Sequence, residues 1–272
     1  MRAYYDANTG AFVRHGQGRA LGAIHRAVWG PGVDSREQAF RYVEDLLVRG
    51  IDELELNRPA HVIDLGCGIG ASLIYLAHQR DIRGTGITLS PEQARIGRER
   101  VESLQRADRV RIVEGDYCAV PADTGTADVA YAIESFVHGP SPIRFFAEAA
   151  RVLRAGGRLV LCDDVRTDVD PAKAAATLDQ FTRGWHVNSL LTAAEWRTHA
   201  AHAGFAHLST LDLTPYLELG RPRDRLIAVL VRAIDWMPRV SLRLAPLIGG
   251  SALQRGLARG WIAYHCASFQ RR

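Results

Sequence analysis

A short hydrophobic segment that ends in a cluster of glycines constrains the fold of this chain more than any other feature. Residues 61–65 read HVIDL, residues 66–70 read GCGIG, and residues 71–80 then resume apolar spacings of three and four. This order predicts a strand, a glycine turn and a helix. Because glycine has no Cβ, backbone N–H groups of such a turn can approach a polar ligand closely. The segment therefore predicts a ligand site at the end of the first strand.

The same alternation of strand and helix continues along the chain. We expect helices at residues 36–51, 91–103, 143–153, 171–185 and 192–203, and further strands at 84–89, 110–114, 128–133, 158–163, 207–213 and 261–269. Strands that alternate with helices predict right-handed crossovers and a parallel sheet. The fold class is thus α/β, with a Rossmann-like, seven-stranded, mostly parallel sheet flanked by helices, an N-terminal helical segment and a C-terminal helical lid.

Three regions follow from this pattern. We expect residues 1–57 to form an N-terminal helical cover and residues 58–165 to form the ligand-binding core. Residues 166–272 form a helical substrate-binding or lid region that also carries the last strands of the sheet. A length of 272 residues fits one α/β domain with added helices as well as it fits two domains.

Composition excludes several classes of protein. Apolar residues make up 47% and charged residues 24%, which is typical of a globular chain and not of a disordered or collagenous one. The longest strongly apolar run, residues 226–231, is far shorter than the ~20 residues that span a bilayer, so we expect no stable membrane insertion. Four cysteines without CxxC spacing and a first segment without an apolar core favour a reducing cytoplasm and no structural zinc.

Charge is distributed unevenly. From residue 215 onward ten arginines face three acids, which gives +7; since the whole chain carries +4, the preceding residues carry −3. This tail is either a solvated basic face or helps to hold an anionic substrate or membrane surface. The spacing of Leu226, Val229 and Leu230 predicts an apolar helix face directed at the core or at a substrate cavity. The core has no dense basic stripe, so we expect no nucleic-acid partner.

The charge near the glycine turn indicates which nucleotide it holds. Residues 66–71 satisfy the GxGxxA pattern of dinucleotide sites, but the second strand ends Gly86-Ile87-Thr88, without the charged residue that would meet the ribose. Asp64 and Asp116 follow or end strands whose carboxyl ends share one edge. These carboxylates would repel a pyrophosphate and attract an ammonium or a sulfonium. A cationic cofactor is therefore favoured over NAD.

Together these segments resemble a known family, the class I S-adenosylmethionine-dependent methyltransferases. The resemblance covers about residues 62–165 and is carried, in order, by VIDLGCGIG, GITLSPEQ, GDYCAVP with ADVAYAIES, and RVLRAGGRLVLCDD. In detail it is similar to the branch of tocopherol, sterol and isoprenoid C-methyltransferases and cyclopropane fatty acid synthases. That branch has a segment like Tyr4-Tyr5-Asp6 and a tryptophan near the position of Trp29.

The resemblance implies a set of cofactor-binding residues. Asp64, Gly66, Gly68 and Gly70 would line the methionine part, Thr88, Leu89 and Gln93 the ribose, and Asp116 with Tyr117 the adenine. Each side chain also has a structural interpretation, such as a turn cap for Asp64 or a surface helix position for Gln93. S-adenosylmethionine is thus the expected cofactor and S-adenosylhomocysteine the product. Cys67 is expected to fill space rather than act as a nucleophile.

The acceptor site is expected at the end of the fourth strand. In the resembled C-methyltransferases a glutamate in such a Glu-Ser segment acts as base or electrostatic stabiliser, which makes Glu134 the first catalytic candidate and His138 the second. Tyr5 is a third candidate because its segment resembles the cover of the family's active site. His25, Trp29 and Trp185 are expected to contact substrate, although aromatic residues also pack lids.

These residues favour a methyltransferase for a hydrophobic small molecule, with carbon methylation of an isoprenoid-like alkene preferred. Three alternatives remain open: an O- or N-methyltransferase of a secondary metabolite, a cyclopropane synthase acting on lipid, and a non-catalytic NAD or nucleotide module. No metal ligands are predicted, and magnesium is expected only as the companion of a diphosphate substrate. A homo-oligomer is possible.

Overall fold

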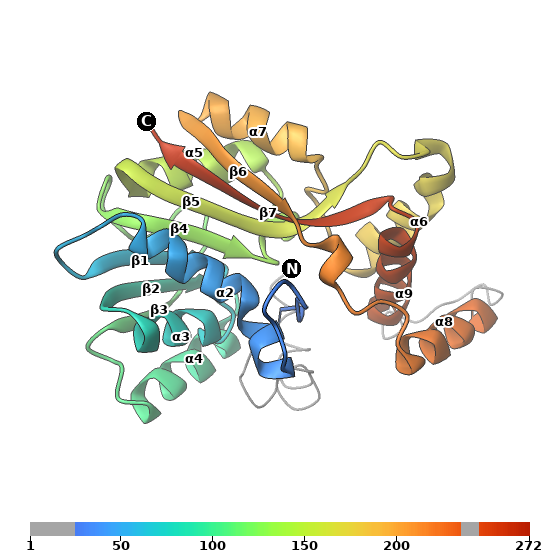
Figure 1. The fold of residues 1–272 in the computed structure, drawn as a ribbon, viewed down its shortest axis with the longest axis horizontal. Helices are drawn as coiled ribbons and strands as arrows, with labels where there is room; N and C mark the ends of the chain where they lie inside the picture. The colour runs from blue at the N-terminus through green and yellow to red at the C-terminus, as the bar shows by residue number, and fades with distance from the viewer. Residues whose placement is uncertain (1–24, 235–244) are drawn as a thin grey trace.

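A computed structural model describes residues 25–234 and 245–272 of the chain. Seven strands form one sheet in the order β3-β2-β1-β4-β5-β7-β6 (Figure 1). The strands are β1 (Ala60–Leu65), β2 (Ile82–Thr88), β3 (Val110–Glu114), β4 (Ala127–Ile133), β5 (Leu153–Arg166), β6 (Phe205–Asp212) and β7 (Ile262–Arg271). β1 to β5 pair in parallel, and β7 is antiparallel to both of its neighbours. The predicted fold class is confirmed.

The described residues form eight α-helices, which lie on the two faces of this sheet or beside it (Figure 1). They are α2 (Arg36–Asp52), α3 (Ala71–Gln79), α4 (Pro91–Ser103), α5 (Pro142–Val152), α6 (Pro171–Gly184), α7 (Ala193–His202), α8 (Pro222–Ile234) and α9 (Ala245–Ala258). Local signals set their starts: the Ser35 hydroxyl accepts a hydrogen bond from the Gln38 N–H, and Ser90 does the same for Gln93 before Pro91. Such caps satisfy N–H groups that have no partner inside the helix.

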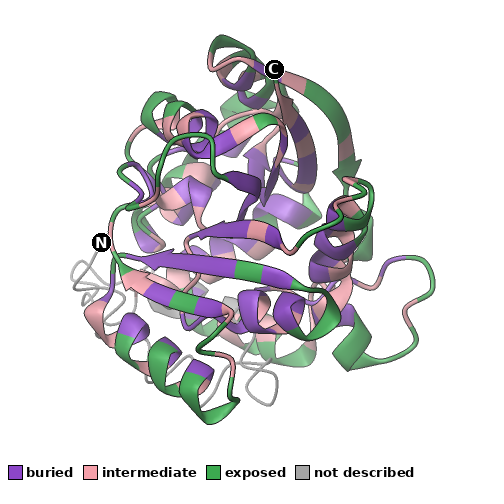
Figure 2. Ribbon diagram, turned by 90° about the vertical axis from the view of Figure 1, so that its left-hand side faces the viewer, coloured by how far each residue is buried: buried purple, intermediate pink, exposed green. Residues whose placement is uncertain are grey.

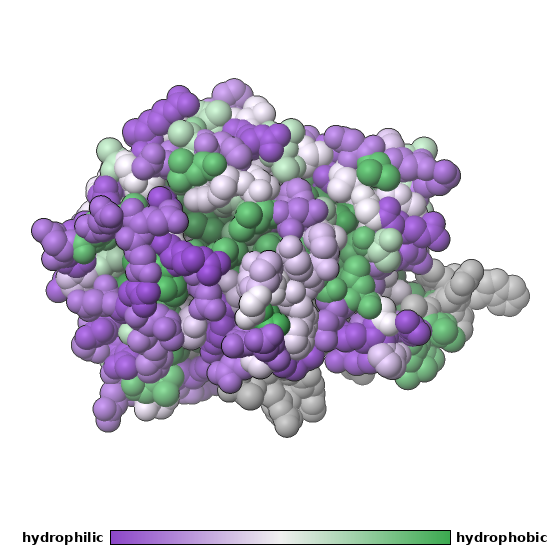
Figure 3. All heavy atoms as spheres, viewed as in Figure 1, coloured by the Kyte–Doolittle hydropathy of each residue, from purple (hydrophilic) through white to green (hydrophobic). Residues whose placement is uncertain are grey.

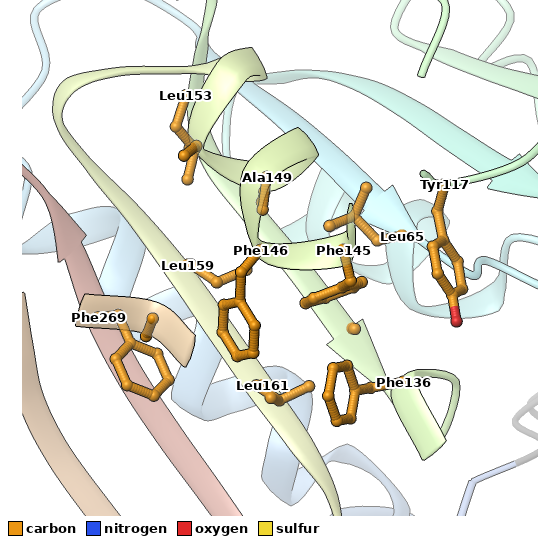
Figure 4. Close-up of a cluster of buried hydrophobic side chains, with 14 of the residues drawn as sticks. Leu65, Tyr117, Phe136, Phe145, Phe146, Ala149, Leu153, Leu159, Leu161 and Phe269 are labelled. Carbon is orange, nitrogen blue, oxygen red and sulfur yellow. The ribbon is translucent and has the colours of Figure 1, made fainter. Parts of the chain in front are cut away.

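Two hydrophobic clusters cover the two faces of the sheet. Helices α5 and α7 bury one face through Phe145, Phe146 and Trp196, which pack with Phe136 and Phe269 (Figure 4). Helices α2, α3 and α4 bury the opposite face through residues such as Val43, Leu47, Leu73, Ile74 and Val101. The strands that lie between these layers are buried along most of their length, as Figure 2 shows in purple. This double cover explains why a central strand such as β4, with the sequence ADVAYAI, is largely apolar.

A third cluster joins α6 to α9 beside the sheet (Figure 1). The two helices cross closely where Gly184 meets Gly249, because a Cβ on Gly184 would lie only 2.6 Å from the main-chain nitrogen of Gly249. Phe181 and Leu253 are buried in this cluster. This packing places α9 next to the carboxyl ends of the parallel strands.

Helix α8 departs from the sequence expectation. Leu226, Val229 and Leu230 are 61%, 66% and 54% exposed, so the expected core-facing or cavity-facing stripe is wrong for these three residues. The helix packs on α9 with other positions, and Ile227 faces the cavity described below. Figure 3 shows hydrophobic residues at the surface where α8 lies. In the described part of the chain, no helix is long and apolar enough to cross a membrane.

Candidate functional site

One cavity of about 870 Å³ opens at the carboxyl ends of the parallel strands. Its inner part is lined by the ends of β1, β2 and β4, by the residues that follow β3, and by residues 25–27. Its outer part is lined by α8, α9 and the segment that joins η2 (Thr214–Tyr216) to α8. The crevice lies where the strand order reverses between β1 and β4, which is where open α/β sheets bind ligands.

The glycine turn after β1 has the geometry of a close ligand approach. Gly66 has a φ of 126°, and a Cβ there would lie 2.3 Å from the Cβ of Ser135. The Ser135 hydroxyl donates a hydrogen bond to the Leu65 carbonyl at 2.7 Å, so the turn is fixed to the end of β4. Gly68 has a φ of 54° and lines the cavity with Gly66. Both glycines therefore permit a backbone path that a larger residue would obstruct.

Two other residues of the turn have structural positions. Gly70 is the N-cap of α3, with a φ of 77°, and is not among the residues that line the cavity. The Cys67 sulfur lies under Gly86, and burial raises the pKa of its thiol well above the ordinary value. A thiol that stays protonated is a poor nucleophile.

Asp64 places a buried carboxyl at the inner wall of the cavity. Only 4% of the residue is exposed, and burial raises its pKa to about 7, an effect that the nearby Tyr131 hydroxyl only partly offsets. A cation bound beside this carboxyl would favour its charged form. The site therefore fits a ligand with a positive group at this position and disfavours a phosphate.

The ends of the next two strands place further polar groups at the cavity. The Thr88 hydroxyl donates to Gln93 Oε1 at 2.7 Å, and both residues line the cavity with the half-exposed Leu89. Asp116 accepts the Cys118 N–H at 2.8 Å, which fixes its carboxylate at the cavity. Tyr117 also lines the cavity, and its hydroxyl donates to the Ser135 carbonyl at 3.2 Å. All of the predicted cofactor residues except Gly70 thus border one space.

Glu134 stands opposite this set, directly after β4. Its φ of 50° is in the left-handed region, which residues other than glycine rarely adopt. Its Oε1 accepts hydrogen bonds from the Arg26 main-chain N–H at 2.8 Å and from the Tyr264 hydroxyl at 2.9 Å. The side chain is 19% exposed and lines the cavity. A strained backbone at a carboxylate held in this way is typical of a functional site.

His138 lines the same cavity from the short helix η1 (Phe136–His138). Its Nδ1 lies 3.4 Å from the His186 carbonyl oxygen. Burial lowers the pKa of His138 below its ordinary value, and the nearby charges of Asp164 and Glu134 oppose this only partly. The imidazole is therefore neutral at pH 7, which is the form that can accept a proton.

His25 is held by partners on both ring nitrogens. Its Nε2 lies 3.3 Å from Oε1 of the buried Glu44, and its Nδ1 lies 3.2 Å from the Arg26 carbonyl, to which it must donate. Burial alone would lower the pKa of His25, but the hydrogen bond and charge of Glu44 raise it. His25 lines the cavity, and this environment favours its cationic form.

The remaining predicted residues are placed differently. Trp185 lines the outer cavity, and its indole N–H donates to the Pro246 carbonyl at 2.9 Å. Trp29 lies outside the cavity lining and packs with Ala27, Ala39 and Phe40. Tyr5 lies outside the described residues. Apolar side chains dominate the outer wall, among them Leu217, Leu219, Ile227, Leu247, Leu253 and Leu257.

Sequence reasoning missed several residues that shape this site. Arg26 donates to both carboxylate oxygens of Asp164, at 2.6 and 2.7 Å, and its guanidinium lies 4.7 Å from the ring centroid of Tyr264. These residues come from three distant segments, so no spacing connects them. One part of the site did have a signal in the sequence. Glu44 lies within the apolar stripe of α2, and because a buried acid requires a partner, this position predicts a contact such as the one observed with His25.

The residues present fit S-adenosylmethionine. The backbone path at Gly66 admits a close ligand, the buried carboxyl of Asp64 suits its cationic end, and polar groups follow at the next two strands. Within residues 25–234 and 245–272, no group of three or more His, Cys, Asp or Glu side chains is placed to hold a metal ion.

Comparisons with known proteins agree with this geometry. A family model described as a methyltransferase domain matches residues 63–161. The (+)-O-methylkolavelool synthase of Herpetosiphon aurantiacus is 29% identical over 222 residues, which cover 80% of this chain and 74% of that protein. The 27-O-demethylrifamycin SV methyltransferase of Amycolatopsis mediterranei is 30% identical over 194 residues, 71% and 70% of the two chains.

A solved structure shows the same fold over the whole chain. It is the geranyl diphosphate C-methyltransferase from Streptomyces coelicolor A3(2), in complex with Mg²⁺, geranyl diphosphate and S-adenosylhomocysteine. The TM-score is 0.72 at 19% identity, with 100% of this chain and 96% of that chain covered. Since the motifs, the fold and a 30% identical relative agree, the chain belongs to the class I S-adenosylmethionine-dependent methyltransferases.

Proposed function

We propose that this enzyme methylates a hydrophobic, isoprenoid-like small molecule, and that the first acceptor to consider is an alkene carbon. The observation that supports this best is the position of Glu134. Its carboxylate faces the same cavity as Asp64 and Thr88, while the outer wall of that cavity is apolar. Ligand pockets of this size and lining hold small organic molecules in which a few polar groups fix the orientation.

On this proposal the inner cavity holds the cofactor. S-adenosylmethionine supplies a methyl group on a positively charged sulfur, and the transfer is an in-line displacement. Asp64 favours the cationic end, Gly66 and Gly68 admit the methionine part, Thr88 and Gln93 bind the ribose, and Asp116 accepts a hydrogen bond from the adenine amino group. Fixing both reactants in an attack geometry can contribute ~7–11 kcal/mol to catalysis.

Glu134 would act on the acceptor. An alkene that attacks a methyl group becomes a carbocation, which then loses a proton. A carboxylate held at the cavity stabilises that positive charge and is placed to accept the proton. We also assign Tyr5 and Trp29 to the cover of the acceptor, as the motif resemblance implies. We assign His25 and Trp185, which both line the cavity, to its walls.

A hydroxyl oxygen is the second candidate acceptor, and two observations favour it. His138 is neutral at pH 7 because burial lowers its pKa, so it can take the proton of a hydroxyl. In addition, the names of both relatives reported above describe O-methylation. His138 would then be the base, and Glu134 would orient the substrate.

The charge at the cavity mouth bears on the head group of the substrate. Arg221 and Arg223 line the cavity, and Arg221 donates to Asp224 at 2.8 Å. Arg223 has no ion pair within the described residues. We infer that a carboxylate or diphosphate head would meet Arg223, and that Mg²⁺ would enter only with a diphosphate, as in the solved complex that contains geranyl diphosphate.

The proposal also concerns partners and location. We propose a small-molecule substrate rather than a nucleic acid, and a cytoplasmic enzyme. All four cysteines are free thiols, which fits a reducing compartment. A homo-oligomer remains a prediction of the sequence.

Methyl-labelled cofactor tests the proposal directly. The full chain is incubated with labelled S-adenosylmethionine and three acceptor classes: prenyl diphosphates with and without Mg²⁺, terpenoid alcohols, and phenols with simple carboxylates. Mass spectrometry and NMR then locate the label. We expect label on carbon or oxygen of an isoprenoid, and a rate for Glu134→Gln at least ~10²-fold lower for a carbon acceptor. Labelling restricted to the non-isoprenoid class would overturn the proposed substrate.

A further inference from the structure

The carboxylate of Glu134 is held by donors from distant parts of the chain. The Tyr264 hydroxyl on β7 and the Arg26 main-chain N–H both donate to Oε1, at 2.9 and 2.8 Å. No residue in the described ranges donates to Oε2 of Glu134. Since Tyr264 is fully buried and Glu134 lines the cavity, the hydrogen bond joins the core to the cavity edge.

A second set of contacts fixes both donors. The Arg26 guanidinium makes a two-point contact with the Asp164 carboxylate, at 2.6 and 2.7 Å. The same guanidinium lies over the Tyr264 ring at 4.7 Å. Paired charged hydrogen bonds define orientation as well as distance, and a cation on an aromatic face adds attraction. Arg26, Asp164 and Tyr264 thus form one rigid support.

The backbone of Glu134 requires such a support. Its φ of 50° costs energy in a residue with a Cβ, and a conformation of this kind persists only when its surroundings hold it. The main-chain N–H of Glu134 donates to the Cys162 carbonyl at 2.8 Å, which fixes the backbone. The side-chain direction is left to Tyr264 and Arg26.

We propose that Tyr264, supported by Arg26 and Asp164, is a positioning residue that fixes the Glu134 carboxylate so that its second oxygen serves the methyl acceptor. The inference rests on the proposed function, in which Glu134 faces the acceptor. Tyr264 itself does not line the cavity and acts only through Glu134.

A kinetic consequence follows from this role. Without the Tyr264 hydroxyl the Glu134 carboxylate loses one of its two hydrogen-bond donors and its fixed direction. Transition-state stabilisation should therefore fall while ground-state binding of substrate is kept.

The test compares Tyr264→Phe with a matched control, Tyr75→Phe. The Tyr75 hydroxyl donates to Asp45 at 2.7 Å, and neither residue lines the cavity. For Tyr264→Phe we expect kcat to fall on the order of ten-fold, with KM and cofactor Kd within about two-fold of wild type, since one hydrogen bond to a charged group is lost. Tyr75→Phe should change none of these.

A double variant separates positioning from general structure. In the Glu134→Gln background, Tyr264→Phe should cost less than about two-fold, because both changes remove the same interaction. The inference is overturned if Tyr264→Phe keeps wild-type kcat, or if it costs as much in the Glu134→Gln background as in the wild type. It is also overturned if the variant loses only thermal stability. A wild-type rate for Glu134→Gln overturns the proposed role of Glu134 as well, whereas a slow Glu134→Gln beside a wild-type-like Tyr264→Phe overturns only the positioning role.

Discussion

Asp64 links cofactor binding to pH in a way that can be measured. Burial raises its pKa to about 7 in the ligand-free protein, from an ordinary value of 3.8. A difference of about three pH units corresponds to on the order of 4 kcal/mol against the charged form. The sign for stability follows: between these two pKa values the folded protein binds more protons than the unfolded chain, so the ligand-free enzyme loses stability as pH rises from about 4 to about 7.

Binding of the cofactor should reverse this preference. A sulfonium and an ammonium beside Asp64 favour the carboxylate, so binding below pH 7 must release a proton. Affinity should then fall by roughly 50-fold between pH 7 and pH 5, since half of the Asp64 carboxyls are already charged at pH 7, and should level off above about pH 8.

Calorimetric titration with S-adenosylmethionine at pH 5 to 8, in two buffers of different ionisation enthalpy, measures both the affinity and the proton release. In Asp64→Asn the slope should disappear, affinity at pH 8 should be lower than wild type, and the ligand-free variant should unfold at a higher temperature than wild type at pH 8. His25 and His138 also line the cavity and remain in this variant, so they serve as the internal control. A wild-type Kd that stays constant from pH 5 to pH 8, or an equal slope in Asp64→Asn, would refute this reasoning.

Further predictions concern single side chains. Gly66→Ala should lower both thermal stability and cofactor affinity, because a Cβ would lie 2.3 Å from the Cβ of Ser135 at a φ of 126°; a variant that binds S-adenosylhomocysteine as wild type does would contradict the assigned turn geometry. Cys67→Ala should keep most of its activity, since burial holds the thiol protonated, and inactivation without loss of cofactor binding would point to a chemical role. Ser90→Ala should lower the free energy of unfolding in denaturant by about 1 kcal/mol, because the N-cap of α4 is lost. An unchanged free energy of unfolding would show that this cap does not stabilise the protein. Phe146→Ala, at a fully buried position, should cost about 3–5 kcal/mol in the same assay, and a cost below about 1 kcal/mol would contradict the packing described here.

Local signals explain why much of the fold could be predicted. The bounds of α4 and β3 agree with the expected ranges because Ser90 and Pro91 mark a helix start and a polar segment precedes the strand. The strand expected at residues 158–163 is longer: β5 runs over Leu153–Arg166, directly after α5. Its first residues contain Gly156 with a φ of 76° and pair with β4 across a register shift. Sheet pairing, which the local pattern does not contain, decides that boundary.

The candidate site likewise contains residues that the sequence predicts and residues that it does not. Residues such as Asp64, Thr88, Asp116 and Glu134 end or follow strands, so the rule that parallel strands share a carboxyl edge was enough to bring them together. Arg26 and Tyr264 meet only through tertiary packing across more than two hundred residues of sequence, which spacing does not reveal.

Helix α8 shows a further limit of sequence patterns. Periodicity identified its apolar stripe, but Leu226 and Val229 are exposed, because α8 packs on α9 through other positions. A hydrophobic period predicts that a helix is amphipathic, and the neighbours in the fold decide which face is buried.

The central claim is that a cationic nucleoside cofactor occupies the crevice between the end of β1 and Glu134. A crystal structure of the full chain with S-adenosylhomocysteine tests it most directly. We expect the amino acid part of the ligand beside Asp64 and Gly66, the ribose at Thr88 and Gln93, and the adenine next to Asp116. Density for S-adenosylhomocysteine in another cavity would contradict the account. So would a crevice that does not bind S-adenosylhomocysteine but binds NADH.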